Sequence, residues 1–314
     1  MSKKIGIIVG AVIVLLLAVW FGGSWYASKK AEEQLEEFVY SNGLQKVVHW
    51  DKVSASILGS ATISNMNIAF NKRDVFLIKE LNINAFKDDY DRKLIDLSIH
   101  GLTDKDGKAP SFITKELAKE IGKVQIESID GKMKVDLNYD SDEGELEFGI
   151  NIPHVGSIAT FAHFEQIYPI RGILDSTRSE DLGGLGSFAL MAKFAVAAEQ
   201  LRFLDAGFSV KDDGFMKRRL ALYKRYADVP LPGKDLDKQQ ENLLKQYIQT
   251  GKERCIEGLE VHNAKFTCEE ISNFFSGEKS SLSVKIKAKG LKTIKDIADS
   301  ILDKSLSGLE IEVD

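Results

Sequence analysis

Residues 122–153, GKVQIESIDGKMKVDLNYDSDEGELEFGINIP, decide the fold of this chain. Apolar and polar residues alternate through much of this stretch, which is typical of strands with one buried and one solvated face. The dipeptide Asp130-Gly131 and the run DSDEG at residues 140–144 are of the kinds that favour hairpin turns. The stretch therefore predicts antiparallel strands joined by tight turns.

The same two-residue period extends towards the N-terminus, through residues 47–70, 76–86 and 93–102. The phrases ISNMNI, IKELNI and LIDLSI within these segments resemble one another, and each places apolar residues two or three positions apart. The segment SFITKELAKEIG, residues 111–122, interrupts the pattern as a short helical crossover. We therefore predict a β-rich meander over residues 47–155.

After Pro153 the apolar residues take helical spacing in VGSIATFAHFEQIYPIRGIL (155–174) and GSFALMAKFAVAAEQ (186–200). The remaining pattern predicts a strand, two helices, a strand, a helix and a last strand, at residues 200–214, 215–228, 235–254, 280–290, 293–306 and 309–313. We therefore predict an α+β C-terminal half over residues 156–314, richer in helices than the first. Whether the two halves share one sheet stays open.

An uncharged run of 23 residues, IGIIVGAVIVLLLAVWFGGSWYA, occupies residues 5–27 between lysine pairs. As a helix it would extend about 34 Å, enough to cross a hydrocarbon core of about 30 Å. Trp20, Trp25 and Tyr26 suit the far membrane interface, because their rings are apolar with a polar edge. A buried core helix is one alternative, and a signal peptide cleaved near Gly22-Gly23-Ser24 is another.

We therefore predict a cytoplasmic tip and transmembrane anchor in residues 1–30, followed by a helical stalk in residues 31–46. A long C-terminal part can translocate whatever its charge, so the expected localisation is single-pass in the inner membrane, with a cytoplasmic N-terminus and a periplasmic body. The predicted fold class is α+β: a single N-terminal transmembrane helix, an antiparallel β-rich region and a helix-rich C-terminal half.

The charge balance of the chain argues against nucleic acid as a partner. The sequence holds 42 Lys and Arg against 47 Asp and Glu, a net charge of −5. The first 30 residues contribute four lysines and no acidic residue, so the rest is more acidic still. An acidic body of this kind is ordinary for a domain in an aqueous compartment and lacks the basic surface that nucleic acids require.

Two cysteines, Cys255 and Cys268, lie close together in the C-terminal third. In an oxidising compartment a close even pair predicts a disulfide, with two unrelated buried thiols as the alternative. The helix ending near residue 254 and a new helix capped by Thr267, with Glu270 three residues on, would let the chain reverse between them. A zinc site is unsupported, because the nearest histidine is His262 and no CxxC spacing occurs.

No motif in the sequence supports catalysis, a cofactor or a metal. The five histidines are scattered, with neither an HExxH motif nor an i,i+4 pair. The string GGLGS at residues 183–187 lacks the glycine that a nucleophile elbow needs and makes no phosphate-binding loop. Glu143, Glu145 and Glu147 alternate along a strand and indicate a solvated face rather than an acid and base pair. The sequence therefore predicts a protein that is not an enzyme.

Two features have a binding interpretation beside a structural one. Lys285, Lys287 and Lys289 share one face of a predicted strand, either as lysines in water beside a half-buried strand or as contacts for lipid phosphates or an acidic partner. The apolar segment at residues 188–196 is either core or, if exposed, the lining of a groove for acyl chains.

Two stretches, FGGSWYASKKAEEQLEEFV (21–39) and SASILGSATISNMNIAF (54–70), resemble the YdgA-like proteins of Gram-negative envelopes. Members of that family begin with a membrane span, a Gly-rich aromatic turn, a Lys pair and an acidic helix. More loosely, the second stretch and LRFLDAGFSVKDDGFMKRRL (201–220) are similar to the periplasmic domains of AsmA-like proteins. The resemblance implies a role in lipid traffic and outer-membrane assembly, and it carries no catalytic residues.

These observations favour a non-enzymatic, inner-membrane-anchored periplasmic protein that binds a hydrophobic (lipid) or protein ligand in envelope maintenance or assembly. The expected partners are membrane lipid and other envelope proteins. A structural scaffold subunit of a membrane complex is the first alternative, and an envelope hydrolase with an unrecognised site is the second.

Overall fold

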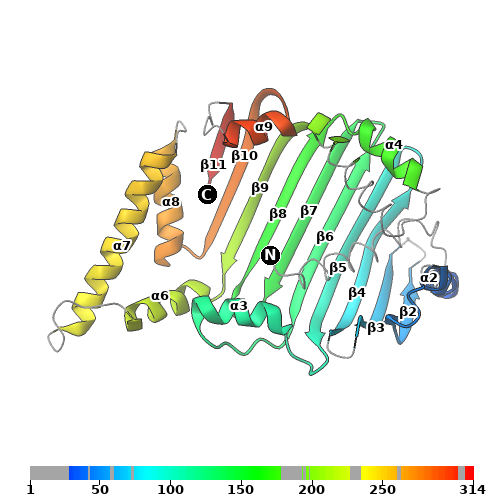
Figure 1. The fold of residues 1–314 in the computed structure, drawn as a ribbon, viewed down its shortest axis with the longest axis horizontal. Helices are drawn as coiled ribbons and strands as arrows, with labels where there is room; N and C mark the ends of the chain where they lie inside the picture. The colour runs from blue at the N-terminus through cyan, green and yellow to red at the C-terminus, as the bar shows by residue number, and fades with distance from the viewer. Residues whose placement is uncertain are drawn as a thin grey trace.

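A meander of antiparallel strands forms one eleven-stranded sheet that runs through nearly the whole described chain (Figure 1). The computed structural model describes residues 28–41, 43–56, 60–71, 74–177, 193, 196–197, 199–226, 235–259, 263–302 and 308–314. The strand order is β1-β3-β4-β5-β6-β7-β8-β9-β10-β11, and β2 pairs with β3 beside β1. The strands are β1 (Val48–His49), β2 (Lys52–Ala55), β3 (Ala61–Ala69), β4 (Val75–Asp88), β5 (Arg92–Asp104), β6 (Ile129–Asn138), β7 (Glu143–Ile152), β8 (Gly156–Glu165), β9 (Arg202–Asp212), β10 (Ser281–Thr293) and β11 (Leu309–Val313).

Helices connect some of these strands and lie along the margins of the sheet (Figure 1). They are α2 (Ser28–Ser41), α3 (Ser111–Ile121), α4 (Tyr168–Thr177), α6 (Phe215–Tyr226), α7 (Leu236–Gly258), α8 (Ala264–Ser276) and α9 (Ile294–Leu302). In Figure 1, α2 lies at one end of the sheet, and α6, α7 and α8 extend beyond β10 and β11 at the other end.

The two-residue period of the strands gives the sheet two unlike faces. In register, Met133 of β6 lies opposite Phe148 of β7, which lies opposite Thr160 of β8. Residues directly opposite each other share a face, so this row continues across the sheet as an apolar face. The neighbouring positions, such as Lys134 and Glu147, point to the opposite, polar face.

Buried clusters form where helices and loops cover the margins of the apolar face. Leu35 and Val39 of α2 pack with Ile63 and Ile83 of the sheet at one end. At the other end, Phe274 of α8 packs with strand residues of β10 and β11, and smaller clusters lie beneath α3 and beside α4. The predicted stalk segment is therefore a helix that packs on the sheet.

The predicted fold class needs correction, because strands β8 to β11 continue the same antiparallel sheet through the C-terminal half, although this half does hold more helices than the first, namely α4, α6, α7, α8 and α9. Residues 155–174, predicted as helical, begin with strand β8 and only then form α4. Ile158, Ala162 and Phe164 follow the strand period on the apolar face, and the intervening Phe161 gave the segment its helical appearance. Pairing of β7 with β8 also crosses residue 155, so the two halves share one sheet.

The predicted hairpin turn at Asp130-Gly131 is also wrong, because both residues lie inside strand β6. The side chain of Asp130 instead accepts a hydrogen bond from the backbone N–H of Gly101, at 2.9 Å, where β5 shifts its register against β6. Gly101 has φ +69°, a conformation that favours glycine, so these polar residues mark a bulge rather than a turn. The predicted turn at residues 140–144 does join β6 to β7.

The transmembrane helix of the predicted fold class has no counterpart in the described structure, where no helix is both long and apolar enough to cross a membrane. The predicted anchor at residues 5–27 and its interfacial side chains Trp20, Trp25 and Tyr26 lie outside the described residues. The fold is accordingly an antiparallel β-sheet with flanking helices.

The predicted disulfide between Cys255 and Cys268 is present and joins α7 to α8, with the two Cα atoms 5.8 Å apart. The chain reverses between the two helices, as the sequence indicated. Helix α8 nevertheless begins at Ala264, after Asn263, so Thr267 lies inside the helix and does not cap it. Because none of the α7 side chains is fully buried, the disulfide is the strongest link between α7 and the rest of the fold.

Replacing both cysteines, in the variant Cys255→Ser/Cys268→Ser, should loosen α7 while leaving the sheet intact. In the chain-entropy model a disulfide across this separation contributes about 3 kcal/mol. Hydrogen exchange followed by mass spectrometry should show lost protection at residues 236–258 and unchanged protection in β4 to β8. Equal loss of protection throughout the sheet would contradict this local role.

Candidate functional site

The centre of the apolar face is exposed, unlike its margins. Leu146, Phe148, Ile158 and Phe208 are 40%, 47%, 42% and 37% exposed, and we call these four residues the apolar patch. They lie on three neighbouring strands, β7, β8 and β9. Core side chains on the same face, such as Ile83, are almost completely buried, so the sheet presents a contiguous hydrophobic surface to its surroundings.

The register of the strands places the side chains of the apolar patch side by side. Thr160 of β8 lies between Phe148 of β7 and Phe208 of β9, so the two aromatic side chains flank a smaller one. The next row holds Leu146, Ala162 and Ala206, again a large side chain beside small ones. This mixture of large and small apolar groups forms an uneven surface suited to a flexible hydrocarbon chain.

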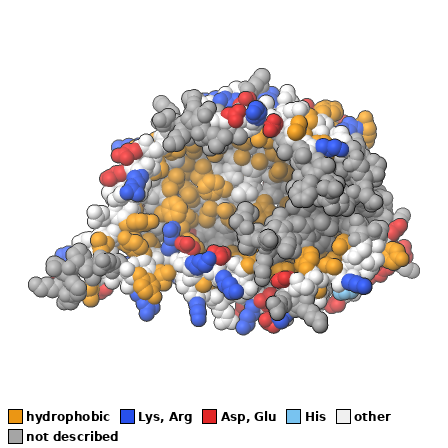
Figure 2. Space-filling model, in the orientation of Figure 1, with side chains coloured by type: hydrophobic (Ala, Val, Ile, Leu, Met, Phe, Trp, Pro, Cys, Tyr) orange, Lys and Arg blue, Asp and Glu red, His pale blue; other side chains and the backbone are white. Residues whose placement is uncertain are grey.

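Figure 2 shows this face as a hollow in which hydrophobic side chains gather, with charged side chains along its lower edge. Among the described residues, the helices lie along the margins of the sheet rather than across its middle. An ion pair between Lys93 and Asp88 also lies on this face, but both side chains are nearly buried and lie away from the patch, on β5 and β4. The geometry therefore offers hydrophobic contact at the centre and polar groups at the rim.

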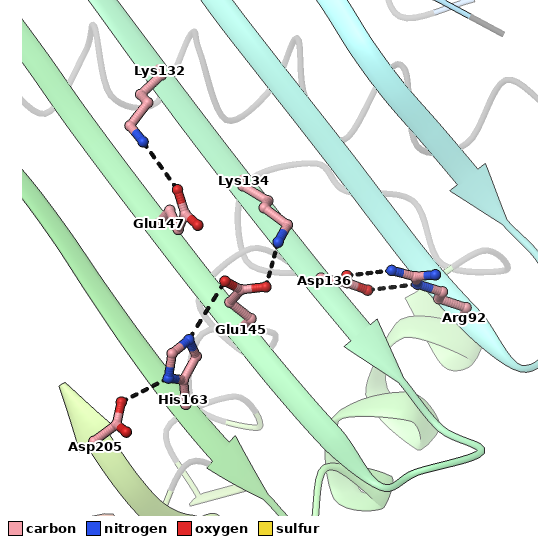
Figure 3. A network of polar contacts seen from close by, with 8 residues as sticks. All are labelled: Arg92, Lys132, Lys134, Asp136, Glu145, Glu147, His163 and Asp205. Carbon is pink, nitrogen blue, oxygen red and sulfur yellow. Dashed lines mark hydrogen bonds and ion pairs between the residues drawn. The ribbon is translucent and has the colours of Figure 1, made fainter. Parts of the chain in front are cut away.

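The opposite face carries a ladder of ion pairs that runs from strand to strand (Figure 3). Arg92 of β5 donates two hydrogen bonds to Asp136 of β6, at 2.8 and 2.6 Å. Lys134 pairs with Glu145 on β7. Beside them, the Lys132 ammonium lies 3.1 Å from the Glu147 carboxylate. These charges are matched across neighbouring strands, as expected for a solvated face.

The ladder continues through His163 of β8, whose ring lies between two carboxylates (Figure 3). Nδ1 of His163 is 2.6 Å from Asp205 on β9, and Nε2 is 3.4 Å from Glu145. Both carboxylates also have a lysine partner, since Asp205 contacts Lys285 at 3.0 Å and Glu145 contacts Lys134. The carboxylates are thereby occupied in cross-strand pairs.

Of the three lysines proposed as ligand contacts, Lys285 and Lys287 point to the polar face and already have acidic partners. Lys285 pairs with Asp205, and Lys287 lies 2.6 Å from Glu312 on β11. Lys289 is exposed, and its backbone N–H donates to the carbonyl of Gly308. The three therefore lie on one strand as predicted, but two of their charges are neutralised by neighbouring strands.

The ion pairs shift the pKa values of their members. Burial by itself would raise the pKa of Glu145, but hydrogen bonds from Lys134 and His163 outweigh burial, and the pKa of Glu145 lies below its usual value. The bond to Glu145 raises the pKa of Lys134, and the bond to Asp136 raises the pKa of Arg92. Each shift favours the charged form, so the ladder stabilises the sheet near neutral pH.

Sequence reasoning missed the apolar patch. Leu146 and Phe148 alternate with Glu145 and Glu147, and the sequence pattern predicts only that they lie on the opposite face of the strand. The local sequence does not distinguish an apolar side chain that a helix covers from one that stays exposed. The segment proposed as an acyl-chain groove, residues 188–196, lies mostly outside the described residues, and within it Val196 is exposed. The exposed apolar surface that the structure does describe lies on β7 to β9.

The N-terminal part of the chain is similar to a known family. A family model described as "Bacterial protein of unknown function (DUF945)" matches residues 1–55, which include α2 and the first two strands. No curated protein matches the chain. The family match thus covers only the N-terminal part of the chain and leaves the sheet from β3 onwards unmatched.

Replacing Glu145 with glutamine should lower stability at neutral pH, by about 1 kcal/mol, because Glu145 joins two cross-strand pairs. Since its pKa is depressed in the folded state, its contribution is complete above the unfolded-state value of about 4.3 and is lost as the pH falls through the folded value. Urea unfolding should therefore separate wild type from Glu145→Gln at pH 7, and the difference should shrink as the pH is lowered below about 4.

The matched control is Glu143→Gln, because Glu143 is an exposed carboxylate on the same strand and forms no ion pair with any described residue. This variant should unfold like wild type throughout this pH range. A loss at Glu145 that persists unchanged in acid would show that the charge of the carboxylate is not the cause.

Proposed function

We propose that this chain is a non-enzymatic bacterial envelope protein that binds the acyl chains of lipid on the apolar patch. The observation that carries the proposal is the exposure of Leu146, Phe148, Ile158 and Phe208 as one surface at the centre of the sheet. Contact between an exposed apolar surface of this kind and water is unfavourable in free energy. Such a surface is typical of a binding site for an apolar ligand.

The dimensions of the patch suit a hydrocarbon chain. Three strands at about 4.8 Å spacing give a width of about 10 Å, and four residues of strand add about 13 Å of length. Each methylene group removed from water contributes about 0.8 kcal/mol, so a chain that covers even part of this surface gains several kcal/mol. The polar groups along the rim remain available to water and to the headgroup.

Other observations support the proposed location in the bacterial envelope. The family match over residues 1–55 is to a bacterial family, and the finer resemblance to YdgA-like and AsmA-like proteins supports a role in lipid traffic. The disulfide favours an oxidising compartment. We accordingly propose a protein associated with the inner membrane whose folded body lies in the periplasm and acts in envelope maintenance or assembly.

Lipid binding can be tested with full-length protein in vesicles that contain a phospholipid with a photoreactive diazirine near the end of one acyl chain. We expect crosslinks in β7, β8 and β9, because an acyl chain seated on the patch touches those strands. The variant Phe148→Asp/Phe208→Asp should reduce these crosslinks at least fivefold, since two carboxylates would have to be desolvated beneath the chain.

The control variant Tyr40→Asp/Phe70→Asp changes two exposed aromatic residues outside the patch and should keep the crosslinks. Wild-type protein without crosslinks in β7 to β9 would contradict lipid binding and favour the alternative of a structural scaffold.

The localisation can be tested by fusing reporters after residue 40. A reporter that is active only in the periplasm should be active, and a cytoplasmic reporter should be silent. The opposite pattern would overturn the proposed orientation.

A further inference from the structure

Helix α6, with the sequence FMKRRLALYKRY, concentrates positive charge on an otherwise acidic protein. Its twelve residues include five cations and no acidic residue: Lys217, Arg218, Arg219, Lys224 and Arg225. The anion contacts predicted from the sequence lie on β10, where acidic residues pair with two of the lysines. Helix α6 is the stronger candidate for an anionic ligand.

The cations of α6 are only partly neutralised by the rest of the fold. Arg219 lies 3.8 Å from Glu120 of α3, and Arg218 donates to the backbone carbonyl of His154 at 2.7 Å. Lys217 and Arg225 are exposed and form no ion pair with any residue that the structure describes. Their charges therefore face the solvent, where they attract anions from a distance.

Exposed aromatic side chains accompany this charge. Tyr223 of α6, Tyr247 of α7 and Phe275 of α8 line a groove of about 360 Å³ between the three helices. Tyr226, at the end of α6, is 75% exposed. Exposed cations together with amphipathic aromatic rings are the composition of a surface that lies at the interface of an anionic membrane.

The position of α6 connects this surface to the apolar patch. Strand β9 carries Phe208 and ends at Asp212, and α6 begins at Phe215, three residues later. From Phe208 to Asp212 the strand extends about 13 Å, which is less than the length of a lipid acyl chain with its headgroup. A lipid headgroup held near α6 would therefore have its acyl chain within reach of the patch.

Helix α6 is also remote from the N-terminal end of the sheet (Figure 1). Seven steps between neighbouring strands separate β1 from β9, the strand that leads into α6, or about 34 Å at 4.8 Å per step. A contact at α6 would thus be a second point of attachment, well separated from the helix α2 that begins the described chain.

We infer that α6, with the aromatic side chains beside it, docks on an anionic phospholipid surface and admits lipid to the apolar patch. The inference rests on the proposed lipid binding and adds the surface from which the lipid is taken. An acidic protein partner would also satisfy the charge of α6, but it would not account for the short connection between α6 and the patch.

The test uses full-length protein in vesicles that contain a phospholipid with the diazirine on its headgroup. With phosphatidylglycerol vesicles we expect crosslinks at residues 215–226, and with phosphatidylcholine vesicles we expect few. The variant Lys217→Glu/Arg225→Glu should reduce the crosslinks with phosphatidylglycerol about tenfold or more, because two attractive charges become repulsive. Raising the salt concentration should weaken the wild-type signal in the same direction.

The control variant Lys46→Glu/Lys52→Glu makes the same change in charge at exposed lysines at the other end of the sheet and should leave the α6 crosslinks in place. Circular dichroism of both variants should match wild type, since all four side chains are exposed. Equal crosslinking of α6 in the two kinds of vesicle would overturn the inference. The inference would also be overturned if phosphatidylglycerol gave no crosslinks in α6 while an acidic peptide protected α6 from hydrogen exchange.

The two probes separate this inference from the proposed function. Acyl-probe crosslinks in β7 to β9 without headgroup-probe crosslinks in α6 would refute the docking surface alone. Headgroup crosslinks in α6 without acyl crosslinks in the sheet would refute lipid binding on the patch and leave α6 as a membrane contact.

Discussion

The alternation of side chains along paired strands is the constraint on which this structure depends. In an antiparallel sheet, directly opposite residues share a face, so the register that aligns Met133, Phe148 and Thr160 also aligns Lys134 and Glu147 on the other side. A slip of one residue would exchange the two faces of a strand and bring charges into the apolar surface. The separation of one hydrophobic and one charged face is thus a consequence of pairing, repeated from strand to strand.

The ion pairs of the charged face link neighbouring strands in a regular arrangement that stabilises the sheet. Most of its pairs are diagonal to the register: Lys134 lies opposite Glu147 but binds Glu145, and Arg92 lies opposite Asn138 but binds Asp136. A twisted sheet brings such diagonal neighbours within reach of long side chains. A face covered with matched charges also resists stacking against another sheet, which protects a protein with so many long strands from aggregation.

The sequence predicted those features that depend on local patterns. Strands β3 to β7, the helices α3 and α6, and the reversal that lets Cys255 meet Cys268 all follow from period, turn residues or spacing. Strand β8 was missed because Phe161, on the polar face, broke the two-residue period. The patch was missed for a different reason: exposure of Phe148 depends on where distant helices pack, which no segment of the sequence encodes by itself.

An exposed apolar patch has a thermodynamic consequence for the whole sheet. Burying a large apolar side chain contributes about 1.5–3 kcal/mol to the free energy of unfolding. The four side chains of the patch are partly exposed, so without a ligand the folded protein gains only part of this contribution from them. A ligand that binds the folded state alone supplies this stability through mass action, by an amount that grows with the ratio of its concentration to its dissociation constant. Because β7, β8 and β9 connect the two covered margins of the sheet, occupation of the patch would stabilise the strands that hold both ends together. The same strands lead directly to α6, so stability of the sheet and access to the membrane would be coupled through β9.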